Sequence, residues 1–238
     1  MSSDERREPG HDVVPFSEGK TWRVHQMLLA AYGQPQLKEQ RDPLSELVLT
    51  ILSQNTADVN TSRAYASLRR RFANWDDVLA APTEQVADAI RIGGLADIKA
   101  PRIQAILKQL REERGALDLG FLADLPLDEA RAYLISLHGV GPKTAACVLL
   151  FALRRPALPV DTHVHRVALR VGLVPPKASA DKAHALLEAQ LPPEAYYPFH
   201  LNVIRHGREV CNAQRPLCDD CVLSEVCDDY AGRQAQGR

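Results

Sequence analysis

The sequence predicts an all-α protein built from many short helices. Ala, Leu, Arg, Glu and Gln dominate, and apolar residues recur at the spacing of amphipathic helices. The sequence has no long stretches of alternating Val, Ile and Thr, the pattern typical of strands. Short turns with Gly or Pro separate the helical segments, which favours a compact bundle of helices.

Several segments carry their own start or stop signals. The helical pattern over 21–33 ends at Gly33, a residue that suits a helix C-terminus. Asp42 followed by Pro43 is typical of an N-cap and a first helical residue. The terminal segment 228–238 is polar, and we expect a frayed tail there. The same periodicity predicts helices over 42–54, 61–72, 83–94, 98–115, 126–139, 142–153 and 181–191.

The composition is that of a soluble globular protein with one large domain or two modest ones. The chain has 238 residues, 45% hydrophobic and 25% charged, with a net charge of -1. No apolar run reaches the roughly 20 residues of a membrane span, and the N-terminus lacks the apolar core of an export signal. We therefore expect a cytoplasmic protein that does not bind a membrane. Basic clusters within 63–71, 99–111 and 205–215 could bind phosphates despite the neutral total, although each alone is more typical of a solvated helix face.

Four of the five cysteines lie close together near the C-terminus, with the spacing C-x6-C-x2-C-x5-C. Nothing in the sequence indicates an oxidising compartment, which argues against disulfides. Structural zinc and an iron–sulfur cluster both remain open, and a single short loop with one close pair favours iron–sulfur. The loop also carries Arg215, which a bound metal would present to a phosphate. The four are Cys211, Cys218, Cys221 and Cys227, whereas Cys147 lies in an apolar run and is expected in the core.

A glycine hairpin joins two predicted helices at "LHGVGPKTAACVLL". Gly139 and Gly141 permit a tight turn with positive φ, and Pro142 suits the first position of the next helix. The turn exposes backbone N–H groups that can hold a phosphate. Lys143 follows in the first helical turn, where the positive end of the helix should lower its amine pKa. Such a lysine is a candidate nucleophile, although a solvated phosphate contact is the simpler alternative.

An acidic residue follows that lysine after one helix and a return. Asp161 stands in "LPVDTHVHRVALRVG", before a segment with apolar residues on one helical face. It is typical of an N-cap, which keeps the carboxylate ionised. A purely structural cap is the usual role of a lone Asp in this position. Its proximity to the hairpin lysine makes it a candidate partner for that amine.

Together these motifs resemble the endonuclease III family. The hairpin "LHGVGPKTA", the later "VDTHVHRV" and the cysteine spacing are similar to that family, which belongs to the helix-hairpin-helix, Gly/Pro-Asp superfamily of DNA glycosylases. "ILSQNTADVN" and "GGLADIKAPRI" also resemble its signature stretches. The resemblance extends over about residues 20–230, and the ordered set of motifs is more specific than any one of them.

The resemblance implies a bifunctional DNA glycosylase and AP lyase of base excision repair. Such enzymes remove oxidised pyrimidines from duplex DNA after flipping the nucleotide out of the stack. Lys143 matches the amine that attacks the sugar C1′ and forms a Schiff base, after which elimination at the 3′ side cleaves the strand. Asp161 matches the carboxylate that stabilises positive charge on the sugar. The four clustered cysteines match the ligands of one [4Fe-4S] cluster.

The resemblance also implies a set of DNA contacts. Loop residues in the family fill the gap left by the flipped base, and others grip the backbone. Three departures put substrate preference in doubt: His138 where proline is usual, Pro142 where a basic residue is usual, and "SQNTAD" where "SAQATD" is usual. The expected DNA contacts are Gln54, Asn55, Leu95, Gly139, Gly141, Thr144, His163 and Arg215.

The implied architecture has two all-α halves with a DNA groove between them. Residues 1–42 would form an N-terminal tail and a helix packed on the cluster domain, 43–153 a six-helix barrel with the hairpin, and 154–238 the cluster domain. The expected partner is double-stranded DNA with damaged bases or abasic sites, bound by a monomer in a prokaryotic nucleoid. The alternatives are a monofunctional adenine or mismatch glycosylase and a non-catalytic DNA-binding iron–sulfur protein.

Overall fold

The computed structural model describes residues 19–36 and 40–236, and within these ranges every regular element is helical. The first part of the predicted N-terminal tail, 1–18, lies outside the described residues. The predicted all-α class is confirmed. The α-helices are α1 (Lys20–Tyr32), α2 (Pro43–Ser53), α3 (Asp58–Arg71), α4 (Trp75–Ala80), α5 (Thr83–Ile90), α6 (Ala96–Arg114), α7 (Leu127–Ser136), α8 (Pro142–Cys147), α9 (Thr162–Val171), α10 (Ala180–Glu188), α11 (Tyr196–Glu209) and α12 (Asp228–Ala235), and the shorter turns are η2 (Arg91–Gly93), η3 (Gly120–Ala123), η4 (Val148–Ala152), η5 (Pro193–Ala195) and η6 (Ser224–Val226).

The helix boundaries follow the local signals in the sequence. Gly33 ends α1 with φ 79° and donates its N–H to the Leu29 carbonyl. The Asp42 carboxylate accepts the Ser45 N–H at 2.9 Å and Pro43 is the first residue of α2, as predicted. Within the last predicted helix of the barrel, α8 continues into the single π-helical turn η4. Such turns leave room for a residue to bulge from a helix.

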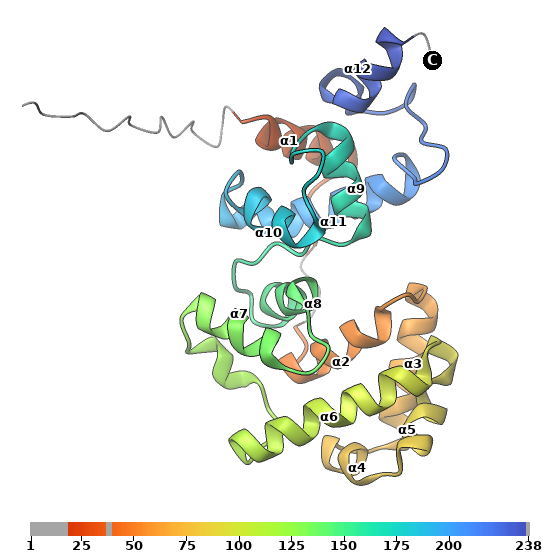
Figure 1. The fold of residues 1–238 in the computed structure, drawn as a ribbon, viewed down its shortest axis with the longest axis vertical. Helices are drawn as coiled ribbons and strands as arrows, with labels where there is room; N and C mark the ends of the chain where they lie inside the picture. Colours follow the sequence, from red (N-terminus) through yellow and green to blue (C-terminus); the bar gives the residue numbers. More distant parts are fainter. Residues whose placement is uncertain (1–18, 37–39, 237–238) are drawn as a thin grey trace, which may run out of the picture.

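The helices form two halves (Figure 1), and each half has its own hydrophobic core. The first is built by α2 to α8, with Leu47, Ile51 and Ile103 fully buried. The second joins α1 to α9, α10 and α11, so the N-terminal helix packs against the C-terminal part of the chain. Leu150 of η4 belongs to the second core, which places the passage between the halves just after α8. None of the described helices has the length and apolarity needed to cross a bilayer.

The C-terminal segment corrects one expectation. Most of the predicted frayed tail forms α12. Asp228 and Asp229 lie in its first turn, where carboxylates stabilise the partial positive charge of a helix N-terminus. A tertiary contact also holds the helix in place, because the Lys20 ammonium on α1 pairs with Asp228 at 2.6 Å. Sequence reasoning weighed the polarity of the segment and missed these two stabilising effects.

Candidate active site

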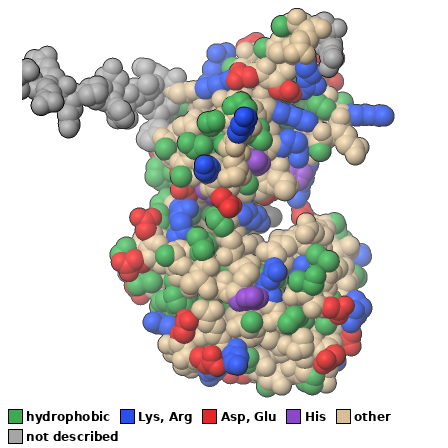
Figure 2. Space-filling model, in the orientation of Figure 1, with side chains coloured by type: hydrophobic (Ala, Val, Ile, Leu, Met, Phe, Trp, Pro, Cys, Tyr) green, Lys and Arg blue, Asp and Glu red, His purple; other side chains and the backbone are tan. Residues whose placement is uncertain are grey.

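A large cleft separates the two halves of the molecule. Its volume is about 1110 Å³, and its walls come from α2, α3 and α8 of the first half and from α9 and α11 of the second. Figure 2 shows the notch between the halves. The Arg208 guanidinium on α11 pairs with the Asp58 carboxylate at the start of α3 at 2.7 Å, so one ion pair joins the two walls. The cleft contains Lys143, Asp161 and several other candidate residues.

The predicted glycine hairpin is present, and its two glycines differ in conformation. Gly139 has φ 72°, and a Cβ there would come 2.5 Å from the Arg102 Nε atom. Gly139 is therefore required by the turn, and a Cβ there would also displace the Arg102 side chain. Gly141 has φ −98°, which any residue can adopt, and nothing lies within 4 Å of an added Cβ. The expectation of positive φ thus holds for the first glycine only, and the protein's own packing does not require the second.

Lys143 is the second residue of α8 and is partly buried in the wall of the cleft. Its ammonium is hydrogen-bonded to Cys147, one turn further along. Burial pulls the pKa of Lys143 down, but the negative charges of the Cys147 thiolate form, Asp161 and Glu46 together raise it. The predicted lowering of this pKa is therefore wrong. The helix-end argument considered one short helix, whereas the hydrogen bond to Cys147 and the carboxylates of Asp161 and Glu46 also act on the amine.

Asp161 is the N-cap of α9, as predicted. Its Oδ1 atom accepts the backbone N–H groups of His163 at 2.9 Å and Val164 at 2.8 Å. These bonds fix the orientation of the carboxylate at the edge of the cleft. The same cleft contains Lys143, and the charge of Asp161 raises the pKa of that amine. The fold thus brings together the lysine and the carboxylate that the sequence singled out.

The extended segment that leads into Asp161 is held by two buried histidines. The Nδ1 atom of His184 on α10 lies 2.8 Å from the Leu158 carbonyl oxygen, and Nδ1 of His200 on α11 lies 2.8 Å from that of Pro159. Burial lowers the pKa of both, to about 4 for His200, so both are neutral near pH 7. Since a carbonyl oxygen only accepts, each Nδ1 carries the proton and donates it. Sequence reasoning missed both histidines, because no local signal identifies their carbonyl partners.

Two further cleft residues were also missed. Glu46 on α2 is only 8% exposed and pairs with Arg41 at 3.5 Å. Its negative charge favours a higher pKa for both Lys143 and Cys147. A glutamate among apolar residues in "PLSELVLT" was an available signal for a functional acid. Cys147 is buried as predicted, but it also lines the cleft beside Lys143, where burial raises its thiol pKa.

Two loops of the first half carry the predicted gap-filling residues. Asn55 and Leu95 both have left-handed backbone conformations, with φ 53° and 52°, and both are exposed at their loop tips. Gln54 is positioned differently. Its side-chain oxygen Oε1 accepts from Arg102 Nη1 at 2.8 Å, and its side-chain Nε2 donates to Thr144 Oγ1 at 3.4 Å. Gln54 thus links the α2–α3 loop to α8.

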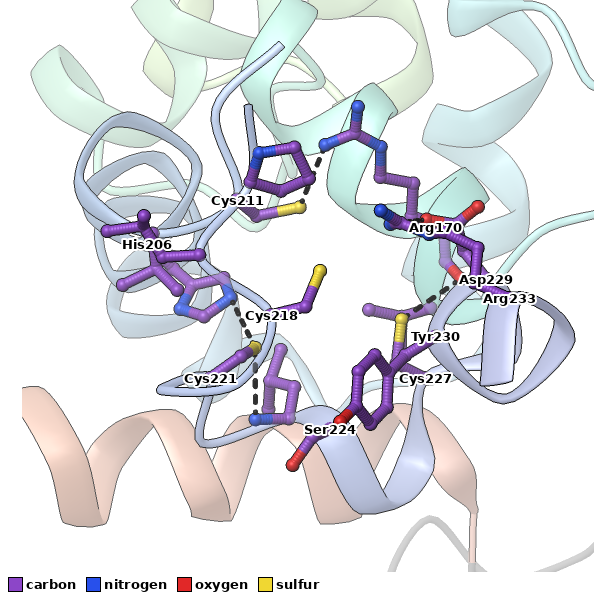
Figure 3. Close-up of a pocket in the computed structure, with 15 residues that line it drawn as sticks. Arg170, His206, Cys211, Cys218, Cys221, Ser224, Cys227, Asp229, Tyr230 and Arg233 are labelled. Atoms are coloured by element: carbon purple, nitrogen blue, oxygen red, sulfur yellow. Dashed lines mark hydrogen bonds and ion pairs between the residues drawn. The ribbon is translucent and has the colours of Figure 1, made fainter. Parts of the chain in front are cut away.

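The four C-terminal cysteines converge, as predicted from their spacing. All are free thiols and line one small pocket, of about 20 Å³ (Figure 3). Arg170 Nη1 lies 3.4 Å from Cys211 Sγ, and the Leu223 N–H lies 3.4 Å from Cys221 Sγ. Burial raises the pKa of Cys221 and of Cys227. Within the described residues, no group of three His, Cys, Asp or Glu side chains is arranged to hold a single metal ion.

Helix α9 connects the cysteine pocket to Asp161. Asp161 caps its N-terminus, and Arg166 and Arg170 follow one turn apart. Arg166 donates to the carbonyls of Cys211 and Gly207 at 3.0 and 2.7 Å, and Arg170 donates to those of Asn212 and Ala213 at 2.8 and 2.9 Å. The cysteine loop, residues 211–227, is thereby held against α9, the helix that Asp161 caps.

The two remaining predicted DNA contacts lie in different surroundings. His163 lines the cleft, and its Nδ1 is 3.1 Å from an Arg166 Nη2 atom. Arg215 is exposed on the loop between the first two cysteines of the pocket, where its backbone N–H donates to the Asn212 side chain at 2.9 Å. The structure therefore places His163 at the cleft and Arg215 on the surface of the cysteine loop.

An all-α fold with a glycine hairpin, a lysine and a capping aspartate in one cleft defines a helix-hairpin-helix DNA-repair protein. The sequence matches the family described as "HhH-GPD superfamily base excision DNA repair protein" over residues 48–193. The chain belongs to this family, within which it is endonuclease III-like, and it is thus an enzyme of the DNA glycosylase class. The predicted family and enzyme class are confirmed.

Known relatives and structures agree with this assignment. Endonuclease III of Thermotoga maritima is 36% identical over 199 residues, which cover 84% of this chain and 89% of that protein. The DNA glycosylase/AP lyase ROS1 of Arabidopsis thaliana is 30% identical over 254 residues, but the chain spans only 18% of its length. A non-covalent endonuclease III–DNA complex superposes with a TM-score of 0.77 at 28% identity, covering 90% of this chain and 96% of that one.

Proposed function

We propose that the chain is a bifunctional glycosylase and AP lyase that removes oxidised pyrimidines from duplex DNA. The observation that carries the proposal is the presence of Lys143 and Asp161 in one cleft beside the hairpin. A trapped covalent endonuclease III–DNA intermediate also superposes on the chain, with a TM-score of 0.77 at 28% identity. Lesion specificity rests on the resemblance to endonuclease III and on no single pocket contact.

The chemistry follows from the placement of the two side chains. As the glycosidic bond lengthens, positive charge develops on the sugar, and the fixed Asp161 carboxylate stabilises it. The Lys143 amine bonds to C1′ while the base leaves with the bonding electrons and takes up a proton. The sugar ring then opens to a protonated Schiff base. Removal of a C2′ proton expels the 3′ phosphate oxygen, and water releases the lysine.

The raised pKa of Lys143 adds a requirement to this scheme. The resting side chain is an ammonium ion, which cannot attack carbon. It must therefore pass a proton to a neighbouring group before or during attack. We propose that Asp161 accepts this proton as the C1′–N bond forms, when the sugar no longer carries the positive charge that the carboxylate stabilises. The same ammonium would attract the DNA phosphates during binding.

We propose that the hairpin and the cysteine loop grip the DNA backbone. Gly141 and Thr144 flank Lys143, and the open space at Gly141 allows a phosphate to approach the backbone. His163 and Arg215 would add contacts from the second half. Asn55 and Leu95 would fill the space left by the extruded nucleotide, and their exposure at loop tips supports this role.

The cysteine pocket fits one [4Fe-4S] cluster, which we propose as the cofactor. Four free thiols line a single pocket, and two arginine side chains, Arg170 and Arg233, lie at its wall to balance thiolate charge. When bound, the cluster would supply cross-links that close the loop between the first and last cysteine. Because Arg166 and Arg170 of α9 bond to this loop, a rigid loop would also hold α9 and its N-cap Asp161 in place.

The two cores support the proposed domain division, with a barrel over 43–153 and a cluster domain formed by 154–238 together with the N-terminal helix. We further propose that the enzyme acts as a monomer on chromosomal DNA in a prokaryotic cytoplasm.

A lesion panel tests the proposed function. Labelled duplexes would each carry one thymine glycol, 5-hydroxycytosine, 8-oxoguanine, mismatched adenine, mismatched thymine or abasic site. We expect base release and strand cleavage for the two oxidised pyrimidines, and cleavage at the abasic site. Release of only the mismatched base without strand cleavage would show a monofunctional enzyme instead. Binding to abasic DNA without any cleavage would show a non-catalytic protein.

A further inference from the structure

The largest fully buried side chain of the described residues is a lysine outside the catalytic cleft. Lys99, in the first turns of α6, is only 2% exposed. Its ammonium donates to the Leu52 carbonyl at 2.7 Å, the Thr56 hydroxyl at 2.8 Å and the Gly93 carbonyl at 3.2 Å. Three donors thus meet three acceptors, and the amine is fully satisfied within the protein.

These acceptors border the two loops that carry the exposed tips. Leu52, in the last turn of α2, and Thr56 lie on either side of Asn55, and Gly93, the last residue of η2, lies two residues before Leu95. The Thr56 hydroxyl also donates to the Gly93 carbonyl, so the loops are joined twice at the same point. One side chain therefore ties together two segments about 40 residues apart in sequence.

Both loop tips need such support. Asn55 and Leu95 have φ 53° and 52°, a left-handed conformation that is unfavourable for most residues with a side chain. For a large residue such as Leu95 this conformation is unusual. It persists only where neighbouring contacts hold the backbone in place. The bonds from Lys99 hold the backbone on both sides of Asn55 and two residues before Leu95.

A buried ammonium is a costly means of filling space. Burial, and to a smaller extent the charge of Arg102, lowers the pKa of Lys99. An apolar side chain of similar volume often stabilises a core as well or better. An apolar side chain could not bond to carbonyls of two loops at once, however. The lysine therefore serves to hold the two segments in a fixed relative position.

We propose that Lys99 is a positioning residue that fixes the two tip loops to each other, so that Asn55 and Leu95 enter the duplex as one rigid unit. The inference rests on the proposed function, because it assigns these tips to the gap left by an extruded nucleotide. Lys99 itself does not touch the reacting atoms. Its contribution should appear only when a base pair has to be opened.

Lys99→Met tests this role, with Lys108→Met as a matched control. Lys108 lies on the same helix, but it is exposed and pairs with Glu112 in the next turn. Single-turnover cleavage would be measured on a lesion-containing duplex and on an abasic site in single-stranded DNA. We expect Lys99→Met to slow the duplex reaction about tenfold or more, since misplacing a positioned group by about 1 Å costs this much or more. Cleavage of single-stranded abasic DNA should change less than twofold, and Lys108→Met should match wild type on both substrates.

A second variant covers the case in which Lys99→Met does not fold. Thr56→Val keeps the shape of the side chain and the buried lysine, but it removes the hydroxyl that joins the loops. We expect it to slow only the duplex reaction, by about threefold, a smaller loss of positioning. Fluorescence of 2-aminopurine opposite an abasic analogue would report base unstacking without chemistry, and both variants should reduce its rise on binding.

The outcomes separate the two proposals. Equal losses on duplex and single-stranded substrates, or unchanged unstacking fluorescence, would overturn the positioning role of Lys99. Wild-type protein that unstacks the duplex but cleaves neither substrate would refute the proposed function and leave the positioning role supported if the variants still lower the fluorescence.

Discussion

Mild acid should weaken the segment that leads into Asp161. His200 is buried, neutral and bonded through Nδ1 to the Pro159 carbonyl, two residues before the carboxylate. Burial lowers its pKa from 6.5 to about 4, with smaller influences from Asp161, Lys143 and His184. Between these two values the unfolded chain binds a proton that the folded chain does not. The free energy of unfolding therefore falls as the pH drops below 6.5.

The size of the effect follows from the width of that window. A difference of 2.5 pKa units corresponds to about 3 kcal/mol once the pH is below 4. At pH 5 the contribution already lost is about 2 kcal/mol. His184, whose pKa is also lowered by burial, acts in the same direction. Above pH 7 both imidazoles are neutral in either state, and this stabilising contribution is fully present.

Urea unfolding of the intact protein at pH 8 and at pH 5 measures this loss. His200→Gln keeps a side-chain donor for the Pro159 carbonyl but cannot take up a proton. The variant should lose about 2 kcal/mol less than wild type between the two pH values. His138→Gln removes an exposed histidine from the hairpin and should keep the wild-type loss. Identical pH dependence in wild type and His200→Gln would refute the reasoning.

Three further predictions concern the hairpin, the carboxylate and the cofactor. Gly139→Ala should destabilise the fold by about 1–3 kcal/mol in thermal unfolding, because its φ is positive and the Arg102 side chain occupies the place of an added Cβ. Gly141→Ala should keep wild-type stability in the same measurement, but it should weaken DNA binding in titrations. Asp161→Asn should slow base release about 100-fold in single-turnover assays while abasic DNA remains bound; an unchanged rate would contradict its role. Iron analysis should give about four irons per chain in a yellow-brown protein, and stoichiometric zinc in a colourless active protein would contradict the cluster.

Local signals in the sequence identified the parts of the fold that depend on local chemistry. The cap at Asp42, the stop at Gly33 and the cap at Asp161 were predicted because each bond joins residues two to four positions apart. Helix α11 was not predicted. It contains Pro198 in its first turn and several histidines and aromatics, so its helical state depends on burial against α1 and α9 rather than on propensity.

The chemistry of the site was predictable only in part, because it also depends on residues far apart in the sequence. The sequence identified Lys143 and Asp161, but the direction of the lysine pKa shift depends on Glu46 and Cys147 as well. Glu46 lies almost 100 residues away in the chain and reaches the amine only through the packing of α2 on α8. Lys99 shows the same limit, since its three acceptors come from two separate loops. Sequence spacing does not reveal such long-range contacts.

Borohydride trapping tests the central claim, that the Lys143 amine attacks the sugar. Wild-type protein incubated with abasic duplex DNA and borohydride should become covalently attached to it, and peptide mapping should place the bond on Lys143. Lys143→Gln keeps a similar length without a nucleophilic amine. It should bind the same duplex and give no covalent product. Trapping of Lys143→Gln at the wild-type level, or a bond mapped to another amine such as the N-terminus, would contradict the account.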